Sequence, residues 1–240
     1  PGDDYHDILR MGLETLATRL KNLVGPALCY RVCVDTAPLL ERSFARLAGL
    51  GWIGKNTCLI NQEQGSWFFL GELLLNLPLA PDAPPPNRCG TCRLCIDHCP
   101  TEAIVPSNGG WIVDAQLCIS YFTIEKHGEI PKQHHEAIGN HIFGCDICQD
   151  VCPWNRRAPS TQEACFQPRH ANPPLTALAE LTEDEFCVLF RNTPIWRAKY
   201  RGFLRNVAIA MGNAGQPHFK APLMKLCTHE DAVVATAARA

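Results

Sequence analysis

The hydrophobic pattern of the first third of the chain predicts mixed helical and extended structure. Leucines recur at helical spacing between positions 13 and 23, which predicts an amphipathic helix over 6–23. Residues 27–34 alternate in polarity and become β-branched towards their end, so they predict a strand. A second helix is expected over 39–48.

Two apolar stretches follow a glycine-rich turn. The turn covers 49–56, and a strand is expected within 58–61. Residues 67–77 are so continuously apolar that their periodicity fits a long helix or a buried strand equally well. Five prolines then fall within the nine residues 78–86. This segment is expected to be a connector, because proline interrupts both helices and central strands.

The C-terminal part predicts one helix after another. From residue 175 onward, short amphipathic stretches at 201–212, 221–227 and 231–240 are separated by glycine or proline. The pattern resembles paired-helix repeats of the HEAT type. We therefore predict an α+β protein with three regions, at 1–82, 83–160 and 161–240.

Composition changes this picture little. The 240 residues are 46% hydrophobic and 19% charged, as in an ordinary soluble protein, and their net charge is −2. That balance excludes a globally basic nucleic-acid binder and leaves local basic patches open. No apolar run reaches the length of a membrane span, and the polar, acidic start is unlike a signal peptide. The absence of an initiator methionine and the helical pattern at the end indicate a fragment.

Cysteine is much more frequent than usual, with 14 in the chain. A disulfide-stapled secreted protein and a metal protein of a reducing compartment are the two alternatives. Eight cysteines gather between Cys89 and Cys152, and no export signal precedes them. We therefore expect metal ligation in a cytoplasmic protein. The six scattered cysteines, Cys58 among them, are interpreted as small buried hydrophobic residues.

The clustered cysteines follow the spacing of bacterial ferredoxins. The first run is Cys89-x2-Cys92-x2-Cys95-x3-Cys99-Pro100, and the fourth cysteine of such a run ligates the other of two clusters. A shorter second run, Cys145-x2-Cys148-x3-Cys152-Pro153, lacks one cysteine, which Cys118 supplies from upstream. The predicted ligands of two [4Fe-4S] clusters are therefore crossed: Cys89, Cys92, Cys95 and Cys152 for one cluster, and Cys99, Cys118, Cys145 and Cys148 for the other.

Zinc is the structural alternative for these cysteines. Zinc sites use two separated Cys-x2-Cys pairs to make one tetrahedron, which fits four cysteines within eleven residues poorly. Two adjacent clusters carry single electrons, so the protein is expected to move electrons. The large regions outside the cysteine module favour an enzyme over a plain ferredoxin-type carrier.

Residues 29–61 contain the best candidates for a catalytic site. Asp35 follows the predicted strand over 27–34, a common place for functional residues in α/β sheets. The Gly51–Thr57 loop carries a cation and an amide between glycines, and such loops let a polar cofactor approach the backbone. Taken by spacing alone, a helix N-cap for Asp35 and an ordinary turn for the loop are the favoured readings.

Four motifs occur in order along nearly the whole chain. They are Asp35-Thr36-Ala37-Pro38 with Glu41-Arg42, the Gly51–Thr57 loop, the double ferredoxin run, and Gly144-Cys145-Asp146-x-Cys148-Gln149-x2-Cys152-Pro153-Trp154-Asn155. In this combination the chain resembles the epoxyqueuosine reductases, which are cobalamin-dependent iron–sulfur enzymes. The resemblance implies an oxidoreductase that converts epoxyqueuosine to queuosine at the wobble position of tRNA, the last step of queuosine biosynthesis. It also implies a partial α/β cobalamin-binding domain in 1–82.

By the same resemblance, Asp35 is the proton donor, since opening an epoxide leaves an alkoxide that needs a proton. The family implies cobalamin without a lower axial protein ligand. The Asp-x-His-x-x-Gly signature of His-ligated cobalamin is absent, because Leu9 follows Asp4-x-His6 where glycine is needed. The implied cobalamin contacts are Asp35, Lys55, Asn56, Thr57, Ser120, Tyr121, Thr123 and Asp146.

A basic segment with interleaved aromatic residues covers 191–205. Phosphate contact with base stacking and a solvated helix face with core aromatics are equally good explanations of it. The resemblance to tRNA-modifying enzymes favours RNA. The expected RNA contacts are Arg156, Arg157, Arg191, Arg197, Lys199, Arg201 and Arg205.

Two competing functions remain open from the sequence. One is a related corrinoid iron–sulfur reductase acting on a small molecule, as dehalogenases do, and the other is a ferredoxin-type carrier. For the main hypothesis we expect two [4Fe-4S] clusters, cobalamin, a tRNA substrate and an external electron donor. We also expect a monomer without membrane association.

Overall fold

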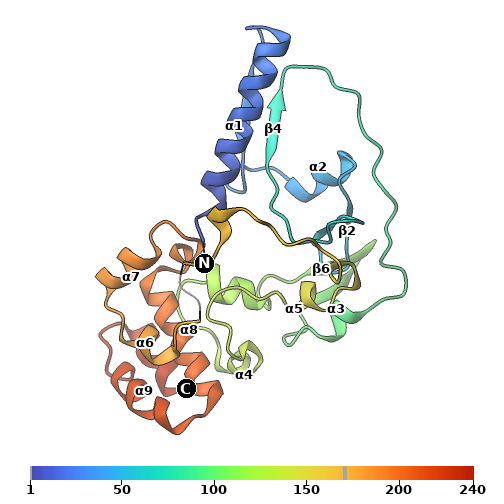
Figure 1. Cartoon of the computed structure of the whole chain (residues 1–240). Helices are drawn as coiled ribbons and strands as arrows, with labels where there is room; N and C mark the ends of the chain where they lie inside the picture. Colours follow the sequence, from blue (N-terminus) through green and yellow to red (C-terminus); the bar gives the residue numbers. More distant parts are fainter. Residues whose placement is uncertain (1, 170–171) are drawn as a thin grey trace.

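The computed structural model describes residues 2–169 and 172–240 (Figure 1). Helix α1, Tyr5–Val24, confirms the helix that the leucine spacing predicts. It projects from the body of the molecule. Asp4 caps its N-terminus by accepting a hydrogen bond from the His6 backbone N–H. Gly25 ends it with a φ of 106°, which glycine tolerates because it lacks a Cβ.

Strand β1, Tyr30–Cys33, pairs antiparallel with β4, Glu72–Leu75, beside α1. The apolar stretch over 67–77 thus contains a strand rather than a long helix. Pairing with β1 covers only Glu72–Leu75, so the strand is shorter than the hydrophobic run. The predicted strand over 27–34 is likewise confirmed in a shorter form.

The second predicted helix is α2, Glu41–Leu47. Beyond it, β2, Trp52–Ile53, and β3, Leu59–Ile60, form a small antiparallel hairpin. The segment predicted as a turn over 49–56 therefore contributes a strand of its own. A Cβ on Gly51 would lie 2.3 Å from the Ile60 carbonyl oxygen, so glycine is needed there for the two strands to approach each other.

The proline-rich segment 78–86 has no regular structure. Figure 1 shows it running along the outside of the molecule, between β4 and the cysteine module. The prediction of a connector is confirmed.

The cysteine module is built from short elements, because its loops wrap around the cysteines. A two-stranded antiparallel sheet joins β5, Ile104–Ser107, to β6, Gly110–Val113. The helical elements are all of five residues or fewer: α3 Leu94–Asp97, η1 Tyr121–Glu125, η2 Lys132–His134, α4 His135–Ile138, α5 Ile147–Asp150, η3 Pro153–Asn155 and η4 Ala164–Phe166.

The C-terminal region is entirely helical, as predicted from residue 175 onward. Its elements are α6 Leu175–Glu180, α7 Glu183–Phe190, η5 Pro194–Ala198, α8 Lys199–Ala214, η6 Pro217–Phe219, α9 Lys220–Leu226 and α10 Ala232–Arg239. Helix α8 lies at the centre of this region and packs against α6 and α10. Phe186, Phe203, Val207 and Val234 are among the fully buried side chains of its core. The α+β class is confirmed, whereas HEAT-type repeats and the three boundaries stay predictions.

Helix α8 also fastens the helical region to the cysteine module. Arg205 donates to the carbonyl oxygens of Phe122 at 2.6 Å, Lys126 at 2.8 Å and Gly128 at 2.6 Å. The next residue, Asn206, donates to the carbonyl oxygen of Thr123 at 2.8 Å. These buried donors satisfy carbonyl groups of the short π-helical element η1 and of the turn that follows it.

The described helices include none with the length and hydropathy required to cross a membrane.

Candidate functional site

Asp35 follows β1 directly and has an unusual backbone conformation. Its φ is 49°, in the left-handed region that non-glycine residues rarely occupy. The Glu41 carboxylate at the start of α2 holds this conformation by accepting a hydrogen bond from the Asp35 N–H at 2.6 Å. Backbone strain of this kind concentrates at functional sites, where the surrounding structure maintains it.

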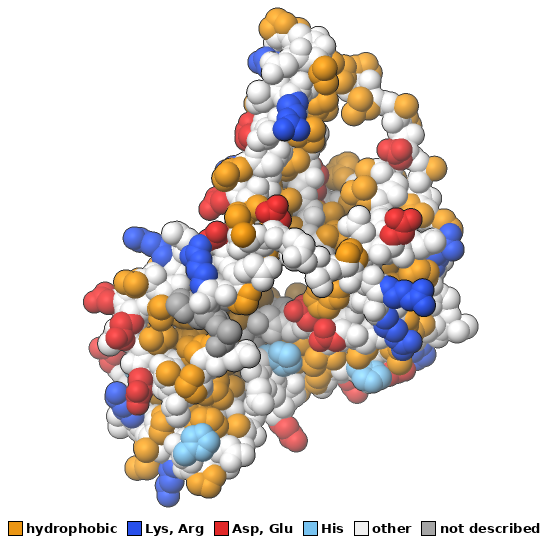
Figure 2. Space-filling model, viewed as in Figure 1, with side chains coloured by type: hydrophobic (Ala, Val, Ile, Leu, Met, Phe, Trp, Pro, Cys, Tyr) orange, Lys and Arg blue, Asp and Glu red, His pale blue; other side chains and the backbone are white. Residues whose placement is uncertain are grey.

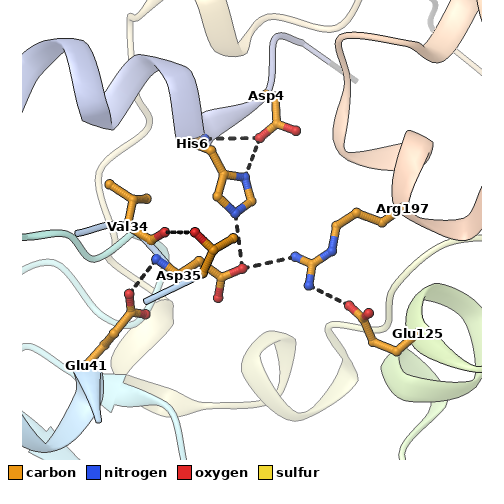
Figure 3. A network of polar contacts seen from close by, with 8 residues as sticks. Asp4, His6, Val34, Asp35, Glu41, Glu125 and Arg197 are labelled. Carbon is orange, nitrogen blue, oxygen red and sulfur yellow. Dashed lines mark hydrogen bonds and ion pairs between the residues drawn. The ribbon is translucent and has the colours of Figure 1, made fainter. Parts of the chain in front are cut away.

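Side chains from two distant parts of the chain contact the Asp35 carboxylate (Figure 3). Its Oδ2 lies 3.1 Å from His6 Nε2 on α1 and 3.3 Å from Arg197 Nη1 on η5. The other His6 nitrogen, Nδ1, lies 2.6 Å from Asp4 Oδ1, and Arg197 also pairs with Glu125 at 2.6 Å. The sequence reasoning missed Asp4, His6 and the role of Arg197, because these residues meet Asp35 only through tertiary folding.

The Asp35 side chain remains 37% exposed. It is no helix cap, because Leu40 occupies the N-cap position of α2. The reading favoured by spacing alone is therefore wrong. A carboxylate that is fixed on one side and open on the other is placed to meet a ligand.

Aromatic side chains form a wall beside this carboxylate. The Tyr5 ring stacks on His6 at 4.2 Å and on Phe69 at 4.3 Å between centroids. Burial, followed by the nearby Asp35 charge and a hydrogen bond to that carboxylate, raises the pKa of Tyr5 to about 12. Tyr5 therefore keeps its proton at neutral pH and acts as a hydrogen-bond donor to Asp35.

A pair of carboxyl groups lies beneath the Asp35 loop. Glu72 on β4 lies near Glu41, the residue that holds the Asp35 N–H, and its buried Oε2 has no hydrogen-bond partner among the described residues. Burial, reinforced by the Glu41 charge, raises the pKa of Glu72 to about 7. Glu72 therefore keeps its proton over the acidic range.

Four cysteines line one cavity of about 250 Å³, together with Trp154 and Lys55. They are the members of the first crossed set: Cys89, Cys92, Cys95 and Cys152. Cys152 comes from the second run, so the fold brings the two runs together as the crossing predicts. Trp52 packs against Cys152 and Cys89, and its indole Nε1 is buried without a partner among the described residues. An all-thiolate donor set around an apolar cavity fits an iron–sulfur cluster.

The second crossed set is held by hydrogen bonds from the flanking segments. The Ser120 hydroxyl accepts from the Cys145 N–H at 3.0 Å, and the Asn56 amide donates to the Cys148 carbonyl oxygen at 3.2 Å. The Ala103 N–H donates to Cys99 Sγ at 3.3 Å, a contact of the kind that stabilises ligating sulfur.

Burial raises the pKa values of Cys95 and Cys145 to about 11 each. These thiols therefore stay protonated at neutral pH unless a metal stabilises the thiolate. Within 2–169 and 172–240, no group of three or more His, Cys, Asp or Glu side chains is close enough to ligate a single metal ion. A four-iron cluster instead places each thiolate on a different iron.

Cys58 belongs to this site, contrary to its interpretation as a plain hydrophobic residue. Interaction between the neighbouring Cys58 and Cys148 thiols lowers the pKa of Cys58 and raises that of Cys148. Cys58, Arg42 and Asp146 line a cavity of about 440 Å³. No spacing rule connects Cys58 to the ferredoxin runs, so only the fold reveals it.

Two of the implied cobalamin contacts are corrected by burial. Thr123 is completely buried, and its hydroxyl donates to the Ile119 carbonyl oxygen and accepts from the Gly144 N–H. Asn56 is 3% exposed and is committed to Cys148 and to the Cys58 N–H. Both side chains support the cysteine loops and have no free polar group to offer a cofactor.

The remaining implied contacts occupy several environments. The Lys55 ammonium donates to the carbonyl oxygens of Gly90 and Cys92, both at 2.8 Å, and so belongs to the first cysteine set. Ser120 is engaged with Cys145. The Thr57 carbonyl and hydroxyl oxygens accept from Arg42, and Tyr121 lies in η1. Asp146 is exposed, and with Thr57 it lies on the side of the module nearest α2.

The glycine loop has a different role from the predicted one. A Cβ on Gly54 would lie 2.5 Å from Ile60 Cδ1 and 2.8 Å from Asn56 Oδ1. The missing side chain therefore makes room for the chain itself rather than for a cofactor.

The predicted RNA contacts divide into exposed and buried residues. Arg205 is 1% exposed and all its interactions are internal, so its assignment to RNA is wrong. Burial lowers its pKa to about 10, and it stays charged at neutral pH. Phe203 is likewise a core residue. The other predicted cations are exposed, apart from the half-buried Arg197: Arg156, Arg157, Arg191, Lys199 and Arg201.

Comparison with known proteins identifies the cysteine module first. A family described as "4Fe-4S double cluster binding domain" matches residues 88–155. The chain is 50% identical over 216 residues to an epoxyqueuosine reductase of Xanthomonas campestris, which covers 89% of this chain and 59% of that protein. The epoxyqueuosine reductase of Escherichia coli is 45% identical over 216 residues, with 89% and 56% covered.

Solved structures give the same result. A crystal structure of epoxyqueuosine reductase with an epoxyqueuosine-modified tRNA-Tyr stem loop matches with a TM-score of 0.90 and 32% identity, over 99% of this chain and 62% of that one. The Bacillus subtilis enzyme, solved with its catalytic aspartate loop swung out of the active site, matches with a TM-score of 0.88 and 32% identity over the same shares.

The chain spans about three fifths of the length of these relatives, 59% in the Xanthomonas protein. The shared stretch contains both cysteine runs and the Asp35 site. Its cysteine module binds iron–sulfur clusters of the 4Fe-4S type. Over this stretch, the chain belongs by sequence and by fold to the epoxyqueuosine reductase family.

Proposed function

We propose that this chain carries the reducing centre of an epoxyqueuosine reductase, an oxidoreductase that forms queuosine at the wobble position of tRNA in the last step of its biosynthesis. The observation that carries the proposal is the Asp35 carboxylate. It is held by His6 and Arg197 and open on one side, next to the cysteine module. The relative bound to an epoxyqueuosine-modified stem loop supports the assignment of the substrate.

The cofactors of this proposal are two [4Fe-4S] clusters and cobalamin. The crossed cysteine sets hold the clusters, and the cavity lined by Cys89, Cys92, Cys95 and Cys152 supports the first set. Asp35, Thr57, Tyr121 and Asp146 remain the candidate cobalamin contacts. When bound, the clusters and cobalamin supply the two electrons that open the epoxide and form the alkene.

The contribution of this chain is to move and stabilise protons. Reduction of an epoxide to an alkene takes two electrons and two protons and releases water, so the leaving oxygen needs an acid. Asp35 donates that proton through its open side. Arg197 then stabilises the carboxylate that remains by donating to Oδ2, and His6 does the same when its Nε2 carries a proton.

His6 and Tyr5 complete this arrangement. His6 bridges Asp4 and Asp35 through its two ring nitrogens and so connects the acid with a second carboxylate. Such a bridge can return a proton to Asp35 after turnover. Tyr5, which stays protonated, fixes the orientation of the carboxylate from the aromatic wall.

The tRNA is the proposed partner of the exposed cations on η5 and α8. Arg191, Lys199 and Arg201 are exposed near Arg197, which reaches into the Asp35 site. Phosphate contacts there would position the anticodon loop over the acid. We place the enzyme in the cytoplasm, as a monomer that receives electrons from an external donor.

Replacement of the acid tests the proposal. Asp35→Ala and Asp35→Asn, made in the full-length protein, are expected to retain iron, cobalamin absorbance and tRNA binding while queuosine formation falls by at least about 100-fold. Asp7→Ala, which removes an exposed acid from the same end of α1, serves as the control and keeps wild-type turnover. Full activity of Asp35→Ala would overturn the proposal.

A further inference from the structure

The two cysteine sets make different contacts with the segment that leads to Asp35. The Asn56 side-chain amide, next to Thr57, donates to the Cys148 carbonyl oxygen of the second set at 3.2 Å. Thr57 accepts from Arg42, which adjoins the Glu41 that holds Asp35. The second set is thus connected to the Asp35 loop through Asn56, Thr57 and Arg42, whereas the loop of the first set is bonded to Lys55 of the same segment.

The loop that carries the first set reaches the surface. Arg88, Gly90, Thr91 and Arg93 are exposed and alternate with Cys89 and Cys92. The loop bounds a cleft of about 790 Å³, whose other walls are the prolines at 84–86 and the turn between β5 and β6. The first set is thus separated from solvent by a single loop.

The cleft and its rim carry several cations, of which Arg93 on the rim is paired with Asp97 at 3.2 Å. The residues lining the cleft include Arg46 and Lys55 but no aspartate or glutamate. Arg93 lies over the Trp111 ring of the cleft wall, with Cζ 5.4 Å from its centroid. Figure 2 shows Lys and Arg side chains gathered on this side of the molecule, in the region of α3 and β6. This positive charge stands against a net charge of −2 for the chain.

Hydrogen bonds of one residue, Lys55, connect the cleft with the loop of the first cysteine set. Lys55 lines the cleft and donates to the Gly90 and Cys92 carbonyl oxygens, both at 2.8 Å. These bonds fix the surface loop in one conformation. A rigid, basic surface over a buried redox centre suits brief encounters, which need little buried area and are accelerated by charge complementarity.

We propose that this surface, formed by Arg46, Arg88, Arg93 and Trp111, docks a small acidic one-electron carrier protein of the flavodoxin or ferredoxin class. The proposal rests on the proposed function, because it assumes a cluster on the first cysteine set. In each encounter the reduced carrier loses one electron and that cluster gains it. Two encounters supply the two electrons of one turnover, and no proton or covalent bond moves in this step.

The test uses the full-length enzyme with its cofactors and an acidic bacterial flavodoxin as the probe. The variant Arg88→Glu/Arg93→Glu is compared with Lys220→Glu/Lys225→Glu, which reverses two exposed cations on α9. Flavodoxin binding to the wild-type protein is expected to weaken as salt rises. At low salt the first variant should bind about tenfold more weakly, and the α9 variant within about twofold of wild type.

A second readout separates docking from chemistry. Queuosine formation driven by reduced flavodoxin should fall in Arg88→Glu/Arg93→Glu, whereas formation driven by dithionite, a small reductant, should not. Absence of product with both reductants in the wild-type protein would contradict the proposed function, and the binding measurement would still decide the docking surface. Because Arg88 and Arg93 adjoin cysteine ligands, Arg46→Glu on α2 provides an independent variant with unchanged iron content. Wild-type flavodoxin binding by both variants would overturn the proposal.

Discussion

The site around Asp35 has two unusual features at the residue scale: the strained backbone of Asp35 and the raised pKa of Glu72. The left-handed backbone of Asp35 depends on Glu41, and the charge of Glu41 contributes to the raised pKa of Glu72. The loop that carries Asp35 therefore rests on a residue next to a carboxyl group that keeps its proton up to about pH 7. The chemistry of this site therefore depends on residues that no substrate touches.

Glu72 predicts a specific dependence of stability on pH. Its pKa is raised from 4.5 to about 7 in the folded protein. Between these two values the unfolded chain releases a proton that the folded chain keeps, so stability falls as pH rises through this window. We expect Glu72→Gln to be more stable than wild type at pH 8 and to lose most of the difference at pH 4.5.

Thermal unfolding measured between pH 4.5 and 8 checks this expectation. The exposed Glu163 provides the control, and Glu163→Gln should follow the wild-type pH profile. Identical profiles for Glu72→Gln and wild type would show that the carboxyl pair does not shift the Glu72 pKa.

At the scale of elements, helix α8 is the most informative. Its amphipathic pattern predicts a helix correctly, yet the pattern assigns Arg205 to the solvent. The structure buries Arg205 because the π-helical element η1 and the turn after it present the Phe122, Lys126 and Gly128 carbonyl oxygens, which need donors. One arginine thus joins the helical region to the cysteine module.

Replacement of Arg205 should destabilise the protein rather than weaken a specific RNA contact. Arg205→Met keeps much of the side-chain volume but leaves the three carbonyl oxygens and Asn206 without this donor. We expect a loss of about 3 kcal/mol in the free energy of unfolding, measured by urea denaturation. Arg201→Met, one turn earlier on α8, removes an exposed guanidinium group 3.7 Å from Asp231 and should change it by less than about 1 kcal/mol. A similar loss for both variants would contradict this role of Arg205.

At the scale of the whole molecule, the exposed cations and the Asp35 site face a common region. Arg197 links them, because it belongs to the basic segment and reaches Asp35 Oδ2 at 3.3 Å. The basic segment is therefore partly structural and partly available to a polyanion. The first cysteine set opens elsewhere, so substrate and electron donor would approach different surfaces.

The salt dependence of tRNA binding should show whether the exposed cations contact phosphate groups. Replacing Arg191, Lys199 and Arg201 together with alanine is expected to reduce the slope of log K against log salt by about two to three. The measurement is the affinity for an anticodon stem loop over a range of NaCl concentrations. An unchanged slope would exclude phosphate contacts by these residues. The variant Lys220→Ala/Lys225→Ala serves as the control, because it removes two positive charges from another surface.

The sequence alone determined the features that depend on local spacing. Ligand spacing identified both cysteine runs, and hydrophobic periodicity located α1, α2 and the C-terminal helices, because three or four neighbouring residues suffice to encode each signal. Tertiary structure alone decided which groups meet across long sequence separations. It joined His6 and Arg197 to Asp35 and buried Arg205. Those contacts depend on how whole elements pack, and packing energy is shared by many residues that no local pattern records.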